Sequence, residues 1–145
     1  MQIPAALPQF KERPALLIVT STTQADFYLA TAGLIESIAS WHVEPPRYSD
    51  HENFSHGGGQ IFESGAMIEK KKELVHAEFE KQFISTLKKL AAEQVFKEVL
   101  LCAPQHLLAG ITELAKGQIK QPVQGIAGNL VKQSLTQILE HLQKR

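Results

Sequence analysis

The sequence predicts a single α/β domain with a mixed sheet of about five strands and helices on its faces. Three observations predict this class. Three short apolar segments lie close together near the N-terminus, a long stretch without Gly or Pro follows, and two strand-like runs then alternate with two helix-like runs. Closely spaced strands favour antiparallel hairpins, whereas strands alternating with helices favour parallel pairing through right-handed crossovers. The sheet is therefore expected to combine both kinds of pairing.

The composition fits one globular domain. The chain has 145 residues, of which 43% are hydrophobic and 21% are charged, so it can bury one core. Its 15 basic and 15 acidic residues balance, so an RNA contact would need a local patch. The single cysteine, Cys102, excludes an intramolecular disulfide. No apolar run reaches the roughly 18 residues of a membrane span, and the N-terminus lacks the basic segment of a signal peptide. We therefore expect a cytoplasmic protein without membrane contacts.

The first part of the chain predicts an arm and an antiparallel meander. Residues 1–14 contain three of the seven prolines, which oppose helix and central strand, so we expect an extended N-terminal arm before a domain over 15–145. Ala15–Ser21 is apolar throughout most of its length, as in a strand buried on both faces. Ala25–Thr31 and Leu34–Val43 follow at short intervals and predict two further strands joined by short turns.

A long polar loop follows the meander. Pro45 and Pro46 end the third strand, and residues 44–65 are rich in Gly, His, Ser and Asp. Loops longer than about 12–15 residues inside a compact domain are usually functional or disordered. This loop is therefore the first place to look for function, and we expect it to be mobile in the isolated protein.

A long helix is predicted directly after the loop. Ala66–Ala92 contains neither Gly nor Pro and carries an apolar stripe at helical spacing. At 1.5 Å per residue the helix would be roughly 40 Å long. Ser64 is a suitable N-cap for it. The residues of the stripe are Ile68, Val75, Phe79, Phe83, Leu87 and Leu90.

The last part of the chain predicts a β-α-β-α order. Val99–Ala103 is a short apolar run typical of a buried strand. Pro104 suits the first turn of a helix, which we expect to continue to about Gly117. Pro122–Ile126 is a weaker strand, and Val131–Leu142 has the apolar spacing of a final helix. This half therefore supplies the parallel strands of the sheet.

Three successive glycines and a glutamine lie in the long loop. Gly57, Gly58 and Gly59 leave the backbone free of side chains, and Gln60 adds one amide side chain and one backbone N–H. Such a segment can enter a narrow site where bulkier residues would clash. The alternative is a flexible loop that contains these residues by chance.

In these features the chain resembles the middle, catalytic domain of the archaeo-eukaryotic class-1 peptide release factors. It is most similar to small bacterial proteins related to that domain, some of which carry the label host attachment protein. In that domain a strand meander leads into a loop bearing His-Gly-x-Gly-Gly-Gln, which is followed by a long helix and a β-α-β-α segment. Here the loop reads His56-Gly57-Gly58-Gly59-Gln60, and the resemblance extends from about residue 14 to residue 142.

The resemblance implies a catalytic role for Gly58, Gly59 and Gln60. In the family this tip enters the peptidyl-transferase centre of the ribosome and promotes attack of water on the ester of peptidyl-tRNA. The Gln60 backbone N–H would stabilise the developing negative charge, as an oxyanion-hole donor does. RNA would form most of the site, so no metal and no cofactor are expected. The implied partners are the ribosome and peptidyl-tRNA, with ribosome rescue as the implied setting.

Basic side chains near the loop are candidates for RNA contacts. They are Arg47, His56, Lys70, Lys71 and Lys72, although the lysines also fit an ordinary solvated helix face. The motif departs from the family's pattern, because it is one glycine shorter and has Gly57 at a position that is often basic there. The chain also has no room for the family's stop-codon-reading domain. The alternative function is therefore a non-catalytic binding or host-attachment-type module of the same fold, and the first function would need a separate docking protein.

Other polar clusters fit ordinary roles. His51 and His56, with their acidic neighbours, match no standard zinc spacing, so a solvated polar loop is expected in place of a metal site. Ser21-Thr22-Thr23 suggests a phosphate-binding turn, but it lacks the glycines and the lysine of a P-loop. Cys102 lies in an apolar run and is expected to be a buried, inert thiol. The other four histidines are scattered and are expected to be ordinary: His42, His76, His106 and His141.

Overall fold

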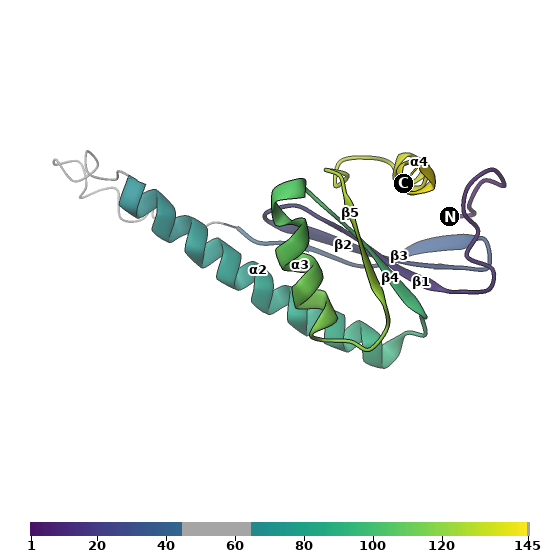
Figure 1. The fold of residues 1–145 in the computed structure, drawn as a ribbon, viewed down its shortest axis with the longest axis horizontal. Helices are drawn as coiled ribbons and strands as arrows, with labels where there is room; N and C mark the ends of the chain where they lie inside the picture. Colours follow the sequence, from purple (N-terminus) through teal and green to yellow (C-terminus); the bar gives the residue numbers. More distant parts are fainter. Residues whose placement is uncertain (45–64, 145) are drawn as a thin grey trace.

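Figure 1 shows the fold in a computed structural model of the chain. The structure describes residues 1–44 and 65–144, and within the second range it describes side chains from residue 72 onward. Its elements in chain order are β1 (Ala15–Thr20), β2 (Gln24–Thr31), β3 (Leu34–His42), α2 (Gly65–Glu93), β4 (Glu98–Ala103), α3 (Gln105–Lys116), β5 (Val123–Ala127) and α4 (Leu135–Lys144).

The five strands form one mixed sheet in the order β3-β2-β1-β4-β5. β1 pairs antiparallel with β2, and β2 pairs antiparallel with β3. β1 pairs parallel with β4, and β4 pairs parallel with β5. The meander therefore supplies the antiparallel half and the β-α-β-α segment the parallel half, which confirms the predicted fold class.

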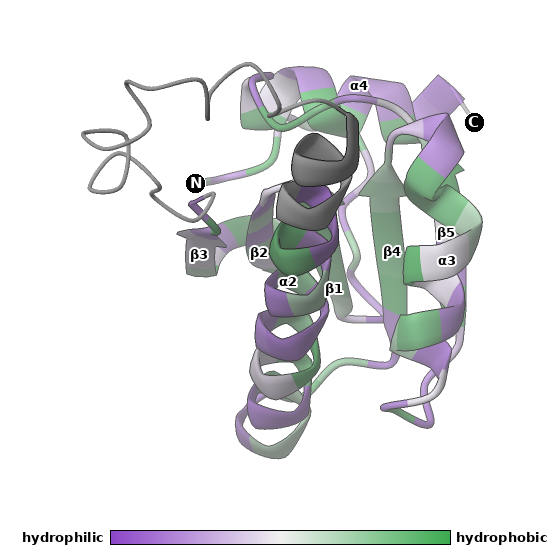
Figure 2. Cartoon of the chain, turned by 90° about the vertical axis from the view of Figure 1, so that its left-hand side faces the viewer, coloured by the Kyte–Doolittle hydropathy of each residue, from purple (hydrophilic) through white to green (hydrophobic). Residues whose placement is uncertain are grey.

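The central strand β1 is fully buried. It lies between β2 and β4, with Leu17 opposite Tyr28 on one side and Leu100 on the other. All six of its residues are buried, as its apolar sequence predicts for a strand covered on both faces. β4 is likewise hydrophobic along its visible length in Figure 2. These two parallel strands form the buried centre of the domain.

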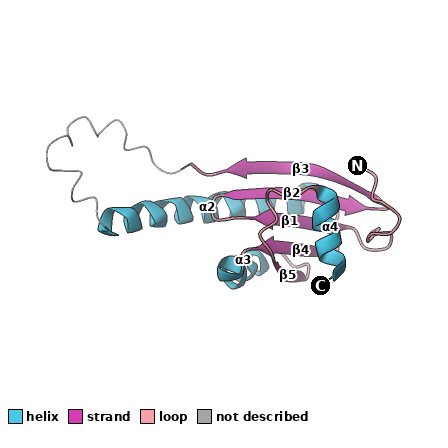
Figure 3. Cartoon of the chain, turned by 90° about the horizontal axis from the view of Figure 1, so that it is seen from above, coloured by secondary structure: helices cyan, strands magenta, loops and turns pink. Residues whose placement is uncertain are grey.

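Helices cover the two faces of the sheet unequally. The side chains of Leu16 and Ile18 point to the face that α2 and α3 cover. Leu17 and Val19 alternate with them and point to the opposite face, where α4 and the N-terminal residues pack. Figure 3 shows α4 crossing the strands, whereas the much longer α2 runs along them. The result is a three-layer domain with a core on each side of the sheet.

The long helix α2 packs on the sheet with its C-terminal half. Phe79, Phe83, Leu87 and Leu90 are buried at spacings of four, four and three residues, and they confirm most of the predicted stripe. Trp41 of β3 helps to fix the helix, because its indole N–H donates to Thr86 Oγ1 at 2.9 Å. Ile68 lies outside the residues whose side chains the structure describes, as does the expected N-cap, Ser64, and Val75 is half-buried. Figure 1 shows the N-terminal part of α2 extending beyond the sheet.

The N-terminal residues pack on the edge of the sheet beside β3. Ile3 and Leu7 are buried in the core on the α4 side. The Ile3 N–H donates to Gly33 O at 2.7 Å, and the N-terminal ammonium of Met1 donates to Ile35 O at 2.7 Å. Hydrogen bonds with the edge strand therefore hold this segment against the domain.

The start of the last helix differs from its prediction. The apolar spacing predicts a helix from Val131, but α4 begins at Leu135. Ser134 and Gln137 form a reciprocal cap: the Gln137 N–H donates to Ser134 Oγ at 3.2 Å, and the Ser134 N–H donates to Gln137 Oε1 at 2.9 Å. The prediction was wrong here because apolar spacing reports which face is buried, whereas a side-chain cap sets where a helix begins.

Candidate functional site

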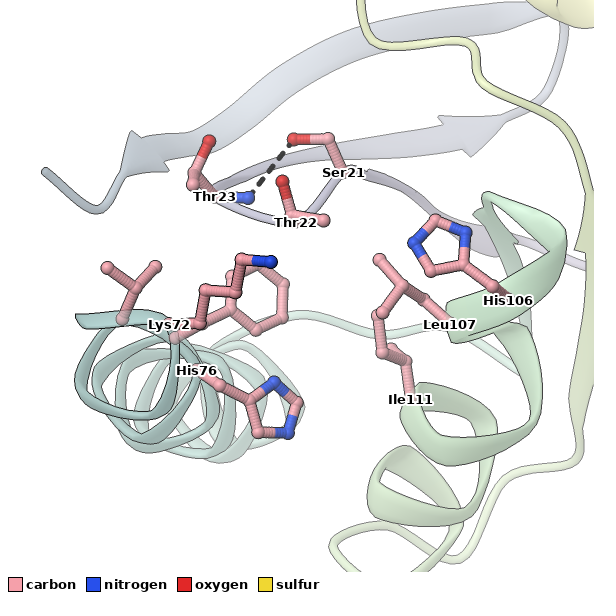
Figure 4. Close-up of a pocket in the computed structure, with 10 residues that line it drawn as sticks. Ser21, Thr22, Thr23, Lys72, His76, His106, Leu107 and Ile111 are labelled. Carbon is pink, nitrogen blue, oxygen red and sulfur yellow. Dashed lines mark hydrogen bonds between the residues drawn. The ribbon is translucent and has the colours of Figure 1, made fainter. Parts of the chain in front are cut away.

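A cavity opens where β1, α2 and α3 meet. Its volume is about 540 Å³. Small-ligand pockets are typically about 300–1,000 Å³, so this cavity has the size of a ligand site. Figure 4 shows the side chains around it, which come from the β1–β2 turn, from the middle of α2 and from the start of α3. The lining residues are Ser21, Thr22, Thr23, Lys72, Val75, His76, Phe79, His106, Leu107 and Ile111.

The first wall is the hydroxyl-rich turn Ser21-Thr22-Thr23. The Ser21 side-chain oxygen accepts the N–H of Thr23 at 3.3 Å and that of Gln24 at 3.1 Å, which closes the turn. Thr20, just before the turn, is fully buried, and its hydroxyl donates to Cys102 O at 3.1 Å. This bond ties the carboxyl ends of β1 and β4 together and so fixes the turn at the edge of the sheet.

The second wall is one face of α2. Lys72, Val75, His76 and Phe79 lie three or four residues apart and so share a face of the helix. Figure 4 shows the ammonium group of Lys72 pointing into the cavity toward the turn. None of the ion pairs among the described residues involves Lys72. His76 Nε2 lies 3.6 Å from Glu80 Oε1, and both side chains are exposed.

The third wall is the first turns of α3. Pro104 precedes this helix with φ −56° and ψ 147°, and no side chain caps the helix there. The Pro104 carbonyl accepts the N–H of Leu107 at 2.9 Å and that of Leu108 at 3.0 Å. His106 and Leu107 therefore lie at the start of the helix, directly after the buried strand β4. Ile111, one turn further along, is buried and forms part of the cavity floor.

A second, smaller cavity continues the first along the groove between α2 and α3. Its volume is about 180 Å³. It shares His76, Phe79, His106, Leu107 and Ile111 with the larger cavity and adds Glu80, Gly110 and Leu114. The turn and Lys72 therefore lie at one end of the combined space, and the part between the two helices combines apolar side chains with His76, Glu80 and His106.

Of the site residues predicted from the sequence, the structure describes the side chain of one, Lys72. Lys72 lines the cavity. Lys70 and Lys71 lie in the first turns of α2, but their side chains are outside the described set. The remaining predicted residues lie outside the described residues. They are the candidate catalytic residues Gly58, Gly59 and Gln60 and the candidate RNA contacts Arg47 and His56. The loop that was expected to be mobile also lies outside the described residues.

Sequence reasoning missed the cavity because its polar groups come from separate segments. The Ser21-Thr22-Thr23 turn lacks a lysine in its own sequence, but α2 places Lys72 beside it. His76 and His106 were expected to be ordinary, yet both line the cavity. Two local signals were available: a Lys and a His four residues apart on one helix, and a His at the start of a helix that follows a buried strand.

Other expectations about chemistry can be compared only with the described residues. Cys102 is buried in β4, as predicted. In residues 1–44 and 65–144 no group of three or more His, Cys, Asp or Glu side chains could hold a metal ion. The helices of this part of the chain are too short or too polar to cross a bilayer.

Comparison with models of protein families gives one match. The family model described as "protein required for attachment to host cells" matches residues 16–142. The chain belongs to this family. The match confirms the resemblance to relatives labelled host attachment protein, whereas the resemblance to the release-factor middle domain stays a prediction.

Solved structures give a weaker likeness. The crystal structure of an archaeal translation termination factor is similar to this family member at 15% sequence identity and a TM-score of 0.45. The match covers 82% of this chain and 31% of the other, so the chain spans about a third of that factor's length. No curated protein matches the sequence.

Proposed function

We propose that this protein acts in translation and that its Gly-Gly-Gln loop promotes hydrolysis of the peptidyl-tRNA ester on the ribosome. The observation that carries the proposal is the sequence Gly58-Gly59-Gln60 in the connection between β3 and α2. The tripeptide combines a backbone free of side chains with one amide, as entry into a narrow RNA site requires.

The position of α2 supports this proposal. The helix begins at Gly65, and among its described side chains, those from residue 72 onward, the first that is buried is Phe79. At 1.5 Å per residue these positions lie about 21 Å apart along the helix axis. Lys72, Glu73 and Leu74 are exposed between them. The end of α2 that receives the loop is therefore carried away from the sheet, as a segment that must reach into another particle requires.

The chemistry needs few protein groups. Water attacks the ester carbonyl carbon, and the carbonyl oxygen takes up negative charge. The bond to the ribose oxygen then breaks, and a proton from the water ends on that oxygen, so that the products are the peptide acid and the tRNA hydroxyl. The Gln60 backbone N–H would donate a hydrogen bond to the charged carbonyl oxygen. Gly58 and Gly59 would let the backbone approach closely, and the Gln60 side chain would shape the space that admits water. The ribosome would supply the rest of the site.

Release of a labelled peptide from peptidyl-tRNA held on ribosomes tests the proposal. Gly59→Ala adds a Cβ where the backbone must pass closely, so we expect it to abolish release. Gln60→Ala keeps the backbone N–H and should lower the rate less. Gln60→Pro removes that N–H, and losing one such donor lowers the rate by about 10²–10³. Equal background rates for the wild type and Gly59→Ala would refute the catalytic role.

Gly117→Ala is the matched control for the glycine variant. Gly117 ends α3 with φ −73°, and a Cβ there would meet its nearest heavy atoms at 3.6 Å and 3.7 Å, which is ordinary contact. We expect this variant to release peptide at the wild-type rate. All variants are compared at unchanged melting temperature, so that loss of release reports the loop and not the fold.

The family description favours a second candidate, a non-catalytic attachment module that uses the same fold for contacts. The balanced charge of the chain agrees with this candidate, because tight ribosome binding depends on phosphate contacts. Co-sedimentation with ribosomes separates the two. Binding that weakens as salt rises supports the translation factor, whereas absence of binding at every salt concentration supports the attachment module.

A further inference from the structure

The larger cavity has a polar end and an apolar end, and it lies at the carboxyl ends of two parallel strands. It lies where the parallel strands β1 and β4 end, since the β1–β2 turn and the start of α3 both line it. Open α/β sheets bind ligands in the crevice outside the carboxyl ends of their parallel strands. The cavity has that position, and its walls carry groups of two different chemical kinds.

We propose that this cavity binds a small phosphorylated ligand of nucleotide size, with the phosphate at the β1–β2 turn and a flat, weakly polar ring between α2 and α3. The proposal uses described residues only and none of the Gly-Gly-Gln loop. Its test is therefore independent of the test of the proposed function.

The polar end suits a phosphate. The Lys72 ammonium points toward the turn, and the residues Thr22 and Thr23 line the same end of the cavity (Figure 4). A cationic side chain is an ordinary phosphate partner, and the Thr22 and Thr23 hydroxyls, whose oxygens point away from Lys72 in Figure 4, would reach a phosphate there after rotation about χ1. His106, at the start of α3, adds a ring nitrogen that can donate from the opposite side.

The charge of the lining also favours an anion. Neither Asp nor Glu is among the described residues that line the larger cavity. Glu80 lies further along the groove, where it pairs with His76 at 3.6 Å and lines only the smaller cavity. An anion at the turn would therefore meet Lys72 without a competing carboxylate in the described lining.

The apolar end suits a flat ring. Val75 and Phe79 of α2 face Leu107 and Ile111 of α3 across the groove. Phe79 and Ile111 are buried and form a fixed floor, whereas Val75 and Leu107 are half-buried and border the opening. Inorganic phosphate alone would leave this apolar surface in water, so a ligand with both parts should bind more tightly than phosphate.

Isothermal titration calorimetry on the isolated protein, without ribosomes, tests the proposal by measuring the affinity of four probes. The probes are a nucleoside monophosphate, the matching nucleoside, inorganic phosphate and an RNA trinucleotide without terminal phosphates. We expect the monophosphate to bind more tightly than each of the other three. Equal binding of the nucleoside would refute the phosphate end, equal binding of inorganic phosphate would refute the apolar end, and tighter binding of the trinucleotide would assign the cavity to RNA.

Four variants at three positions locate the binding. Lys72→Gln removes the cation and should weaken monophosphate binding about fivefold, the scale of an exposed charge contact. Thr22→Asp places a carboxylate at the turn and should weaken it further, whereas Thr22→Asn, of similar size and uncharged, should weaken it less. Lys88→Gln changes an exposed lysine of α2 that does not line the cavity and should leave the affinity unchanged.

These outcomes decide the proposal. Monophosphate binding that responds to Lys72 and Thr22 but not to Lys88 supports it. Absence of monophosphate binding at millimolar concentration overturns it, and so does binding that is equal in all four variants. Each of the three positions is exposed in the structure, and melting temperatures check that the variants are folded.

Discussion

The packing of α3 against β5 leaves no space for a side chain at position 125, and Gly125→Ala tests that geometry. A Cβ built on Gly125 would lie 2.7 Å from Thr112 Oγ1 and 3.2 Å from Leu108 Cδ1, both on α3. Carbon and oxygen do not approach to 2.7 Å without repulsion, so either the Thr112 side chain or the whole helix must move. The residues that form one wall of the cavity lie on the same helix.

The expected loss follows from this overlap. Adding a methyl group to a well-packed region destabilises a protein by about 1–3 kcal/mol. A smaller opposing effect of about 0.4–1 kcal/mol comes from the lower freedom of Ala in the unfolded chain. We therefore expect Gly125→Ala to lower the free energy of unfolding by about 1–2 kcal/mol.

Thr112→Ala supplies the matched second variant. Thr112 Oγ1 is buried and has no hydrogen-bond partner among the described residues. Removing it relieves an unsatisfied polar atom and clears the space that the new methyl group would occupy, so Thr112→Ala alone should be close to neutral. In the double variant the loss caused by Gly125→Ala should largely disappear.

Urea denaturation of the wild type, both single variants and the double variant measures the coupling. We expect a coupling free energy of at least about 1 kcal/mol, since the two side chains would occupy the same space. Additive effects of the two substitutions would refute the overlap and with it the position of α3 over β5. A Gly125→Ala variant with an unchanged free energy of unfolding would also refute the overlap.

Two further predictions concern a helix cap and a half-buried tyrosine. Ser134→Ala removes the side-chain acceptor at the start of α4 and should lower the free energy of unfolding by about 1 kcal/mol. Ser134→Asp keeps an acceptor and should lower it less. Thermal melts measure both variants. Burial, and then the negative charge of Asp26, raise the pKa of Tyr28 above its ordinary value of 10.0. The neutral phenol is therefore favoured by folding, and its contribution to stability is complete below pH 10 and is lost as the pH rises through the higher folded-state pKa. We expect the free energy of unfolding to fall less steeply above pH 10 in Tyr28→Phe than in the wild type, and equal slopes would contradict this.

The environment of Asp26 explains why it can act on Tyr28. Asp26 is buried in β2, where its carboxylate accepts hydrogen bonds from Ser40 Oγ at 2.5 Å and from Gln24 Nε2 at 3.1 Å. Tyr28, two residues further along the strand, lies on the same face of the sheet. This polar pair follows from the alternation of β2.

Most of the fold could be predicted because its signals are local. The apolar run of β1 and the stripe of α2 depend on neighbouring residues, and both elements form within one residue of their predicted bounds. The start of α4 could not be predicted from apolar spacing, because the reciprocal cap of Ser134 and Gln137 sets it. Periodicity reports the buried face of an element, whereas its end depends on which group satisfies the free backbone N–H groups.

The candidate sites divide in the same way. The Gly58-Gly59-Gln60 motif is a contiguous stretch, so the sequence alone identifies it, although it lies outside the described residues. The cavity joins Ser21–Thr23, Lys72 and His106, which are far apart in the sequence. No single segment contains enough of its polar groups to stand out, and the turn itself lacks the glycines and the lysine of a P-loop.

The sequence by itself determined the type and order of the elements, the mixed character of the sheet, the absence of an intramolecular disulfide and the presence of the glycine-rich loop. Only the tertiary structure decided that Lys72 lies beside the β1–β2 turn and that α3 closes the cavity opposite α2. The physical reason is the range of the forces involved. Backbone preference and apolar periodicity act between neighbours in the chain, whereas a binding cavity depends on parallel pairing and helix packing that bring distant segments together.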